Sequence, residues 1–368
     1  MSSKRMRLQP IEAQILGKNT MIKEKGRGTV RAYLNEEEQN KLSQIRESDS
    51  AFENECKALG IEPHTVSNYW YKGKHFSIHT KPNQTNIEDI KDDIISQMNE
   101  HSPKYKKVFH SSKPNPHLLV IDPADIHVGK LATAMESGEE YNMQIAVQRV
   151  LDGVQGILDK SKGFHIDQIL LVGGNDVLHI DSPSRKTTSG TPQDTDGMWY
   201  ENFMMAKQLY VDVIEMLATH APLHFVFNPS NHDYMSGFFL ADVIKSWFRQ
   251  HPHVSFDTSV AHRKYFRYGN SLIGTTHGDG AKNAPLPILM AQEAPKDWAF
   301  TKHRYIYTHH LHHKIAQDVV GVTIEALRSP SATDSWHHRN GYQHAPKAVE
   351  GFLHHPEHGQ VARLTHIF

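Results

Sequence analysis

The sequence has little of several features that would each define a class of protein. It contains one cysteine, Cys56, in 368 residues, which excludes an internal disulfide framework and suits a reducing cytoplasm. Its formal net charge is −1, so any surface that attracts nucleic acid must be local. No apolar run approaches the ~20 residues of a membrane span, and the basic start 1–7 lacks the apolar core of a signal peptide. We expect a cytoplasmic location without a membrane partner.

The length and the punctuation of the chain predict about two domains. A linker rich in serine and proline, 111–116, places the domain boundary near residue 112. Residues 1–35 are basic and lack periodicity, which predicts a flexible N-terminus. We therefore expect a helical domain with its linker over 36–111 and a larger α/β domain over 112–368.

Several stretches show helical or strand patterns. Asn35 is the expected N-cap of a helix that ends near Glu47, because an acidic first turn follows it. The alternation of strands and helices predicts a layered α/β architecture, with the last segment closing a sheet edge. Further helices are predicted over 85–98, 142–160, 199–217 and 237–249, and a strand over 322–327.

Five apolar runs in the larger domain each end in aspartate, asparagine or histidine. The first, Leu118–Ile121, reads as a buried strand, and open α/β sheets place their chemistry at such strand ends. One D-x-H pair alone has a plainer explanation, such as a loop carboxylate that caps a helix. Five in order are poorly explained by chance. The polar residues are Asp125 and His127, then Asp176, then Asn231, His232 and Asp233, then His277, and then His310 and His312.

This order resembles the calcineurin-like metallophosphoesterases, whose pattern is D-x-H, G-D, G-N-H-D/E, H and G-H-x-H, each after a strand. The resemblance covers about residues 117–320. It implies two sheets packed between helices. The segment 329–342, expected to return over the site, is similar to tails of phage-encoded members of this superfamily.

Three positions depart from the family pattern. Asn175 separates the glycine from the carboxylate of the second block, Ser230 stands where glycine is usual, and His309 replaces the glycine of the fifth block. An asparagine is a poor bridge between two cations, so the bridging position is carried over to Asp176, with Asn175 as the alternative.

The resemblance also implies roles for the residues at the strand ends. His232 would donate to the phosphoryl oxygen or the leaving group, and Asp233 would orient the His232 ring. His179 is similar to a histidine of the break-repair nucleases. The first ion would be held by Asp125, His127 and His312, the second by Asn231, His277 and His310, and Asp176 would bridge them.

The chemistry of these ligands limits the metal. Carboxylate, amide and imidazole donors suit manganese, iron or zinc better than calcium or magnesium, and the lack of thiolates disfavours a structural zinc. Similarity to the nucleases favours two manganese ions.

A polar loop over 181–197 follows the second block. Loops this long in a compact domain are usually functional or disordered. The loop carries Arg185 and Lys186, which we expect to bind substrate, although a solvated insertion explains it equally well.

Residues 52–70 resemble a helix-turn-helix, with Gly60 at the turn and Pro63 in the first turn of the second helix. Its second helix would present residues suited to phosphates and base edges. A small helical domain used for protein contact or homo-oligomerisation is the alternative. The predicted DNA-binding residues are Thr65, Asn68, Lys72 and Lys74.

Three functions compete. The first is a manganese-dependent DNA nuclease, supported by His179, the basic loop and the helix-turn-helix pattern. The second is a phosphoesterase that acts on a small nucleotide or another phosphoester. The third is a non-catalytic DNA-binding or scaffold protein, which a complete ligand set argues against.

Overall fold

The computed structural model describes residues 4–8, 30–58, 69–72, 77–80, 91–92, 94–96, 114–342 and 344–368. The chain divides into two compact units, Met1–Ser102 and Pro103–Phe368, with the boundary somewhat earlier than the predicted residue 112. In the described part of the chain, no helix has both the length and the apolar character needed to cross a membrane.

The N-terminal unit begins with a β-ribbon in the segment predicted to be flexible. Strand β1 (Lys4–Leu8) pairs antiparallel with β2 (Val30–Leu34). Helix α2 (Glu36–Ala58) follows, and it starts as predicted: the Glu38 N–H donates to Asn35 Oδ1 (2.9 Å), while the Asn35 N–H donates to the Glu38 carboxylate (2.8 Å).

Two predictions for this unit are wrong. One continuous helix, α2, replaces the two expected helices, because no glycine or proline interrupts 36–58. Lys72 lies in strand β3 (Tyr69–Lys72), which pairs antiparallel with β4 (Ser77–Thr80), where aromatic residues favour a strand over a recognition helix. Thr65, Asn68 and Lys74 lie outside the described residues. In the predicted helix 85–98, the described residues 91–92 and 94–96 are helical.

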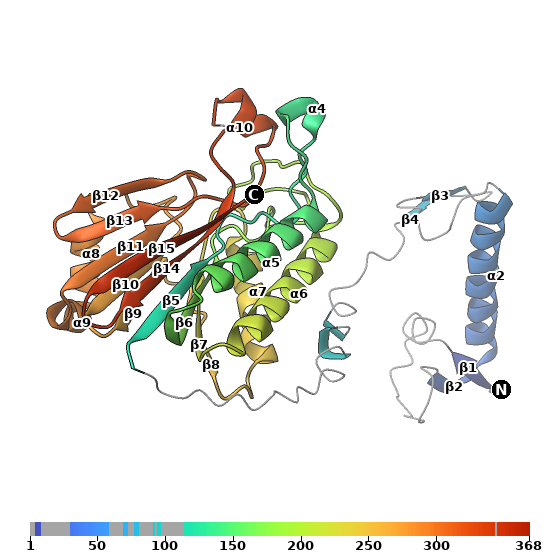
Figure 1. The fold of residues 1–368 in the computed structure, drawn as a ribbon. Helices are drawn as coiled ribbons and strands as arrows, with labels where there is room; N and C mark the ends of the chain where they lie inside the picture. Colours follow the sequence, from blue (N-terminus) through green and yellow to red (C-terminus); the bar gives the residue numbers. More distant parts are fainter. Residues whose placement is uncertain are drawn as a thin grey trace. The chain divides into compact units, whose positions relative to one another are not determined.

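The second unit contains two sheets flanked by helices, as predicted (Figure 1). The larger sheet has the order β15-β14-β5-β6-β7-β8. Four of its strands are parallel, and β14 and β15 extend it antiparallel beyond β5. The strands are β5 (Pro116–Asp122), β6 (His165–Gly174), β7 (Leu223–Asn228), β8 (Val254–Asp257), β14 (Ala348–His355) and β15 (Gly359–Ile367).

The smaller sheet has the order β12-β13-β11-β10-β9, with β10, β11 and β13 parallel. Apolar residues of both sheets, among them Val120, Val172, Ile273 and Phe352, form one buried core cluster. The strands are β9 (Arg263–Tyr268), β10 (Ser271–Thr276), β11 (His303–Thr308), β12 (Ile315–Val319) and β13 (Val322–Ala326).

Helices α5, α6 and α7 pack on the larger sheet, and α8 buries Leu286 and Met290 against the smaller one. Short helices α4 and α10 contact each other at one end of the unit. The bounds are α4 (Ala134–Ser137), α5 (Met143–Lys160), α6 (Trp199–Ala218), α7 (Tyr234–Trp247), α8 (Leu286–Glu293), α9 (Pro295–Phe300) and α10 (Ser335–Arg339).

Candidate metal centre

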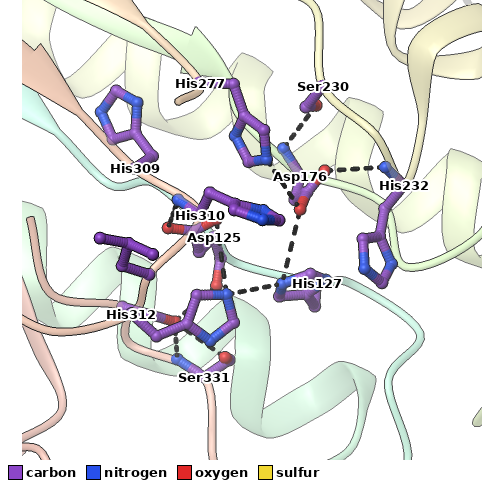
Figure 2. A network of polar contacts seen from close by, with 12 residues as sticks. Asp125, His127, Asp176, Ser230, His232, His277, His309, His310, His312 and Ser331 are labelled. Atoms are coloured by element: carbon purple, nitrogen blue, oxygen red, sulfur yellow. Dashed lines mark hydrogen bonds and ion pairs between the residues drawn. The ribbon is translucent and has the colours of Figure 1, made fainter. Parts of the chain in front are cut away.

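The carboxyl ends of β5, β6, β7, β10 and β11 deliver their polar residues to one place (Figure 2). The C-terminal halves of these strands are buried, and the ligand-type side chains follow where each strand ends. Among the residues that the structure describes, three groups of side chains each have their ligand atoms within 4.8 Å of one another. They are Asp125, His127 and His312; Asp176, His277 and His310; and His127, His179 and His232.

The first cluster consists of Asp125, His127 and His312. Asp125 and His127 are buried, and the His312 side chain is 15% exposed. His312 Nε2 lies 3.5 Å from Asp125 Oδ1 and 3.2 Å from His127 Nε2. The Asp125 carboxylate also accepts the backbone N–H of His310 at 3.0 Å, which fixes the loop after β11 against the loop after β5.

The second cluster consists of Asp176, His277 and His310, with Asn231 beside it. His277 Nε2 lies 3.2 Å from Asp176 Oδ2 and 2.8 Å from Asn231 Oδ1. Its Nε2 thus faces two oxygens, one from an amide and one from a carboxylate. His310 is exposed, whereas Asp176 and His277 are buried.

Asp176 lies between the two clusters. Its Oδ2 is 3.2 Å from His277 Nε2 and 4.0 Å from His127 Nε2. Asn175 belongs to neither cluster: its side chain is buried, and neither amide atom has a hydrogen-bond partner in the described part of the chain. The geometry therefore favours Asp176 over Asn175 as the shared position.

The backbone at the clusters is strained. Non-glycine residues rarely adopt positive φ, and such strain gathers at functional sites. Five of the seven predicted ligands adopt it: Asp125 (52°), His127 (52°), Asp176 (58°), His310 (71°) and His312 (58°).

The two clusters also differ in the charge of their histidines. Burial, with the neighbouring His232 and His312, lowers the pKa of His127 well below its ordinary value, so this imidazole is neutral and can donate a lone pair. Burial would also lower the pKa of His277, but the Asp176 carboxylate outweighs it and raises that pKa to about 9. Burial acts to raise the pKa of Asp176, and His277 and His232 hold it below its usual range.

The predicted catalytic residues His232 and His179 lie beside the first cluster. Their rings stack at 5.3 Å, and His179 Nδ1 lies 3.2 Å from His127 Nδ1. The His232 backbone N–H donates to Asp176 Oδ1 at 3.0 Å.

The predicted contact between Asp233 and the His232 ring is wrong. His232 Nδ1 instead donates to the backbone carbonyl of His179 at 2.9 Å. The buried Asp233 carboxylate accepts the Leu178 N–H (2.8 Å) and the Ser230 hydroxyl (2.5 Å), because it turns into the loop after β6. Burial, together with Asp176, raises the pKa of Asp233 to about 7.

Two departures from the family pattern have structural explanations. The Ser230 Oγ accepts the Asp176 N–H at 2.7 Å and so links Asp176 to Asp233. His309 is buried, with Nε2 3.0 Å from the Asp122 carboxylate and Nδ1 3.0 Å from the Thr276 carbonyl. Both residues therefore hold the loops of the site in place through buried hydrogen bonds.

The predicted substrate loop is fastened to the site. The Thr188 N–H donates to the Asn231 carbonyl at 3.2 Å, and the Asp181 carboxylate accepts the Ser236 N–H at 2.7 Å. Arg185 and Lys186 are exposed.

Sequence reasoning missed Lys130, which is 1% exposed and lies in the first block. Its Nζ lies 2.9 Å from Asp334 Oδ2. Asp334 also holds His337, whose Nδ1 lies 2.7 Å from Asp334 Oδ1 and whose ring stacks on His312 at 5.0 Å. The segment 329–342 therefore returns over the site as predicted. Only the position of Lys130, three residues after His127, hinted at a role.

No model of a protein family matches the sequence, and no curated protein matches it. Solved structures that it resembles include an archaeal phosphodiesterase (8% identity, TM-score 0.33), over 68% of this chain and 99% of that chain. Zinc-bound Vps29 from Entamoeba histolytica has 11% identity and a TM-score of 0.29 over 68% and 98%. A predicted phosphoesterase from Streptococcus pneumoniae has 14% and 0.29 over 68% and 97%. At these values the likeness is too low to carry any conclusion about this chain.

Proposed function

We propose that this protein is a metal-dependent phosphoesterase, with a pair of divalent ions held by the two clusters. The observation that carries the proposal is the Asp176 carboxylate, which faces His127 of one cluster and His277 of the other. A carboxylate shared by two sets of imidazole and carboxylate donors is what a two-ion centre needs.

The donor set fits such ions. Mixed oxygen and imidazole ligands suit manganese, iron or zinc. Asp125, His127 and His312 would hold one ion, and Asn231, His277 and His310 the other. When bound, the pair supplies a hydroxide nucleophile near neutral pH and neutralises charge on the phosphoryl oxygens.

His232 would act on the substrate rather than on the metal. Its Nδ1 is engaged by the His179 carbonyl, so Nε2 is the ring nitrogen left to meet a phosphoryl or leaving-group oxygen. Donation from Nε2 would require a proton on both ring nitrogens, because Nδ1 already donates one to the His179 carbonyl. His179 would orient His127 through the 3.2 Å contact between their Nδ1 atoms.

The test is hydrolysis of bis(p-nitrophenyl) phosphate by the chain after EDTA treatment, with Mn²⁺, Fe²⁺ or Zn²⁺ added back. We expect metal-dependent turnover that Asp125→Ala abolishes. Asp242→Ala, at an exposed position of α7, is the matched control. Turnover without metal, or full activity in Asp125→Ala, would contradict the proposal.

We further propose that the substrate is DNA and that the native metal is manganese. Support comes from the exposed Arg185 and Lys186 on a loop fastened to Asn231.

The double variant Arg185→Ala and Lys186→Ala should raise KM for DNA, flatten its salt dependence and leave the aryl diester unaffected. The double variant Lys245→Ala and Arg249→Ala, at exposed positions, is the control. A higher kcat/KM for mononucleotides than for duplex DNA, single-stranded DNA or RNA would favour the small-phosphoester alternative.

A further inference from the structure

A cavity of about 180 Å³ opens beside the first cluster, under the segment that carries α10. His312 belongs to both, because it lines the cavity while its Nε2 lies 3.5 Å from Asp125. A group in the cavity would therefore be adjacent to a phosphoryl group at the metal centre. The polar residues that line it are His312, His313, Thr333, His337, Tyr342 and Lys347.

The lining is suited to a negative charge. No aspartate or glutamate is among the described residues that line the cavity. Lys347 is half-buried, and its Nζ donates to Thr333 Oγ1 at 3.1 Å. It forms no ion pair with a carboxylate in the described part of the chain, so donors remain for a ligand.

The nearest acids have other partners. Asp334 is paired with Lys130 and with His337. Glu139 accepts the Thr333 N–H at 3.3 Å, and its charge attracts Lys347 only from a distance. An ammonium group without a paired carboxylate is a strong hydrogen-bond donor to an oxyanion.

The cavity wall is held firmly in position. Asp334 is the N-cap of α10 and accepts the His337 N–H at 2.8 Å. The buried Lys130 anchors Asp334 to the loop after β5. His337 is thus fixed with its ring stacked on His312, which holds the cavity wall against the first cluster.

We infer that this cavity binds a second phosphate of the substrate, distinct from the one that is hydrolysed, with Lys347 as its main donor. The inference rests on the proposed function. It specifies the substrate as one with at least two phosphates in sequence, either a neighbouring phosphodiester of a strand or the other phosphate of a mononucleotide bisphosphate.

The test uses two substrates that differ by one phosphate. These are the p-nitrophenyl ester of thymidine 5′-phosphate and the same ester with a 3′-phosphate. A charge-assisted hydrogen bond predicts a kcat/KM roughly 10- to 100-fold higher for the 3′-phosphorylated ester. Lys347→Ala should remove that advantage and leave the other ester unchanged. Lys347→Arg should restore part of it, and Lys245→Ala, at an exposed position, should have no effect.

An oligodeoxynucleotide with the same 5′ p-nitrophenyl group distinguishes the two sources. A larger effect of Lys347→Ala on the oligomer than on the bisphosphate identifies a strand as the ligand, and the reverse identifies the mononucleotide. If both esters are hydrolysed equally by the wild type and by Lys347→Ala, the cavity does not bind phosphate, although the proposed function stands.

A measurement without turnover separates the two proposals. In EDTA, sulfate should raise the Tm of the wild type more than that of Lys347→Ala, while Lys245→Ala reports the general salt effect. If neither ester is hydrolysed, the proposed function fails and the sulfate result alone decides the fate of the anion site. If sulfate raises the Tm of all three proteins equally, the anion site is overturned.

Discussion

Two buried polar regions of the same unit are built on opposite principles. Near the β14 and β15 edge, Glu350 is fully buried and contacts Arg328 and Arg363, and Arg363 also contacts Glu325, so two cations match two anions. At the candidate metal centre, His127 instead contacts the rings of three other histidines.

The difference shows what each region is for. A buried charge is tolerated when it is paired, and the Glu350 network meets that condition by itself. The candidate metal centre combines the neutral His127, the buried Asp176–His277 pair and left-handed backbone, and such backbone strain costs stability. We therefore expect substitutions in the first region to change stability and substitutions in the second to change activity.

The largest expected effect is that of Asp176→Asn. The amide keeps the shape of the side chain, and asparagine tolerates positive φ, but it is a poor bridge between cations. Activity should fall roughly 10⁴-fold, equivalent to the several kcal/mol that a bound metal contributes. Metal content, kcat and urea unfolding of the same preparation check this, and activity within tenfold of the wild type would remove Asp176 from the shared position.

The converse substitution is Glu350→Gln. It leaves Arg328 and Arg363 facing a neutral group in a buried place, and breaking a buried pair costs about 3–5 kcal/mol. We expect that loss in the free energy of unfolding and a kcat close to that of the wild type. Glu357→Gln, at an exposed position near the same edge, should be silent, whereas a catalytic defect without a stability defect would reverse the comparison.

The same contrast explains what could be predicted from sequence. Apolar runs that end in polar residues identify strand ends, so they predict that Asp125, Asp176 and His277 lie close together, whereas the two sheets follow from the family resemblance. The partner of a ring nitrogen depends on loop geometry, which sequence does not give. Asp233 was therefore assigned to His232, although the carbonyl of His179 occupies that position.

Other misses have the same cause. Lys130 is a lysine in a loop, and its burial depends on Asp334, which lies far along the chain. In the N-terminal unit, α2 runs past the helix end predicted near Glu47, and aromatic residues place Lys72 in strand β3 rather than in the predicted second helix.

His232→Ala separates chemistry from metal binding. We expect the His232 ring to act on the substrate. No side chain of the Glu350 network is expected to have such a role. The variant should retain both metals and have a KM close to that of the wild type. Its kcat should fall about 10²–10⁴-fold, the range of a positioned general acid. Loss of a metal would make His232 a ligand. Asp233→Asn should affect the free energy of unfolding more strongly than it affects kcat, because the Asp233 carboxylate accepts hydrogen bonds from Leu178 and Ser230.

The smallest expected effect concerns pH and the buried His354, which lies between the sheets with Nε2 2.9 Å from the Tyr307 hydroxyl. Burial, with His303, lowers its pKa to about 3, against roughly 6.5 in an unfolded chain. The neutral ring is thus favoured in the folded state. Its contribution to stability is complete above pH 6.5. It declines by about 1.4 kcal/mol per pH unit as pH falls toward 3, because the unfolded chain then binds the additional proton.

His354→Gln removes this titration, so the stability difference between wild type and variant should shrink by about 1.4 kcal/mol between pH 8 and pH 5.5. Urea unfolding of both proteins at the two pH values measures it. A difference that does not change with pH would mean that His354 is not kept neutral by burial, and the contrast between a self-sufficient interior and a site that needs its ligand would lose this support.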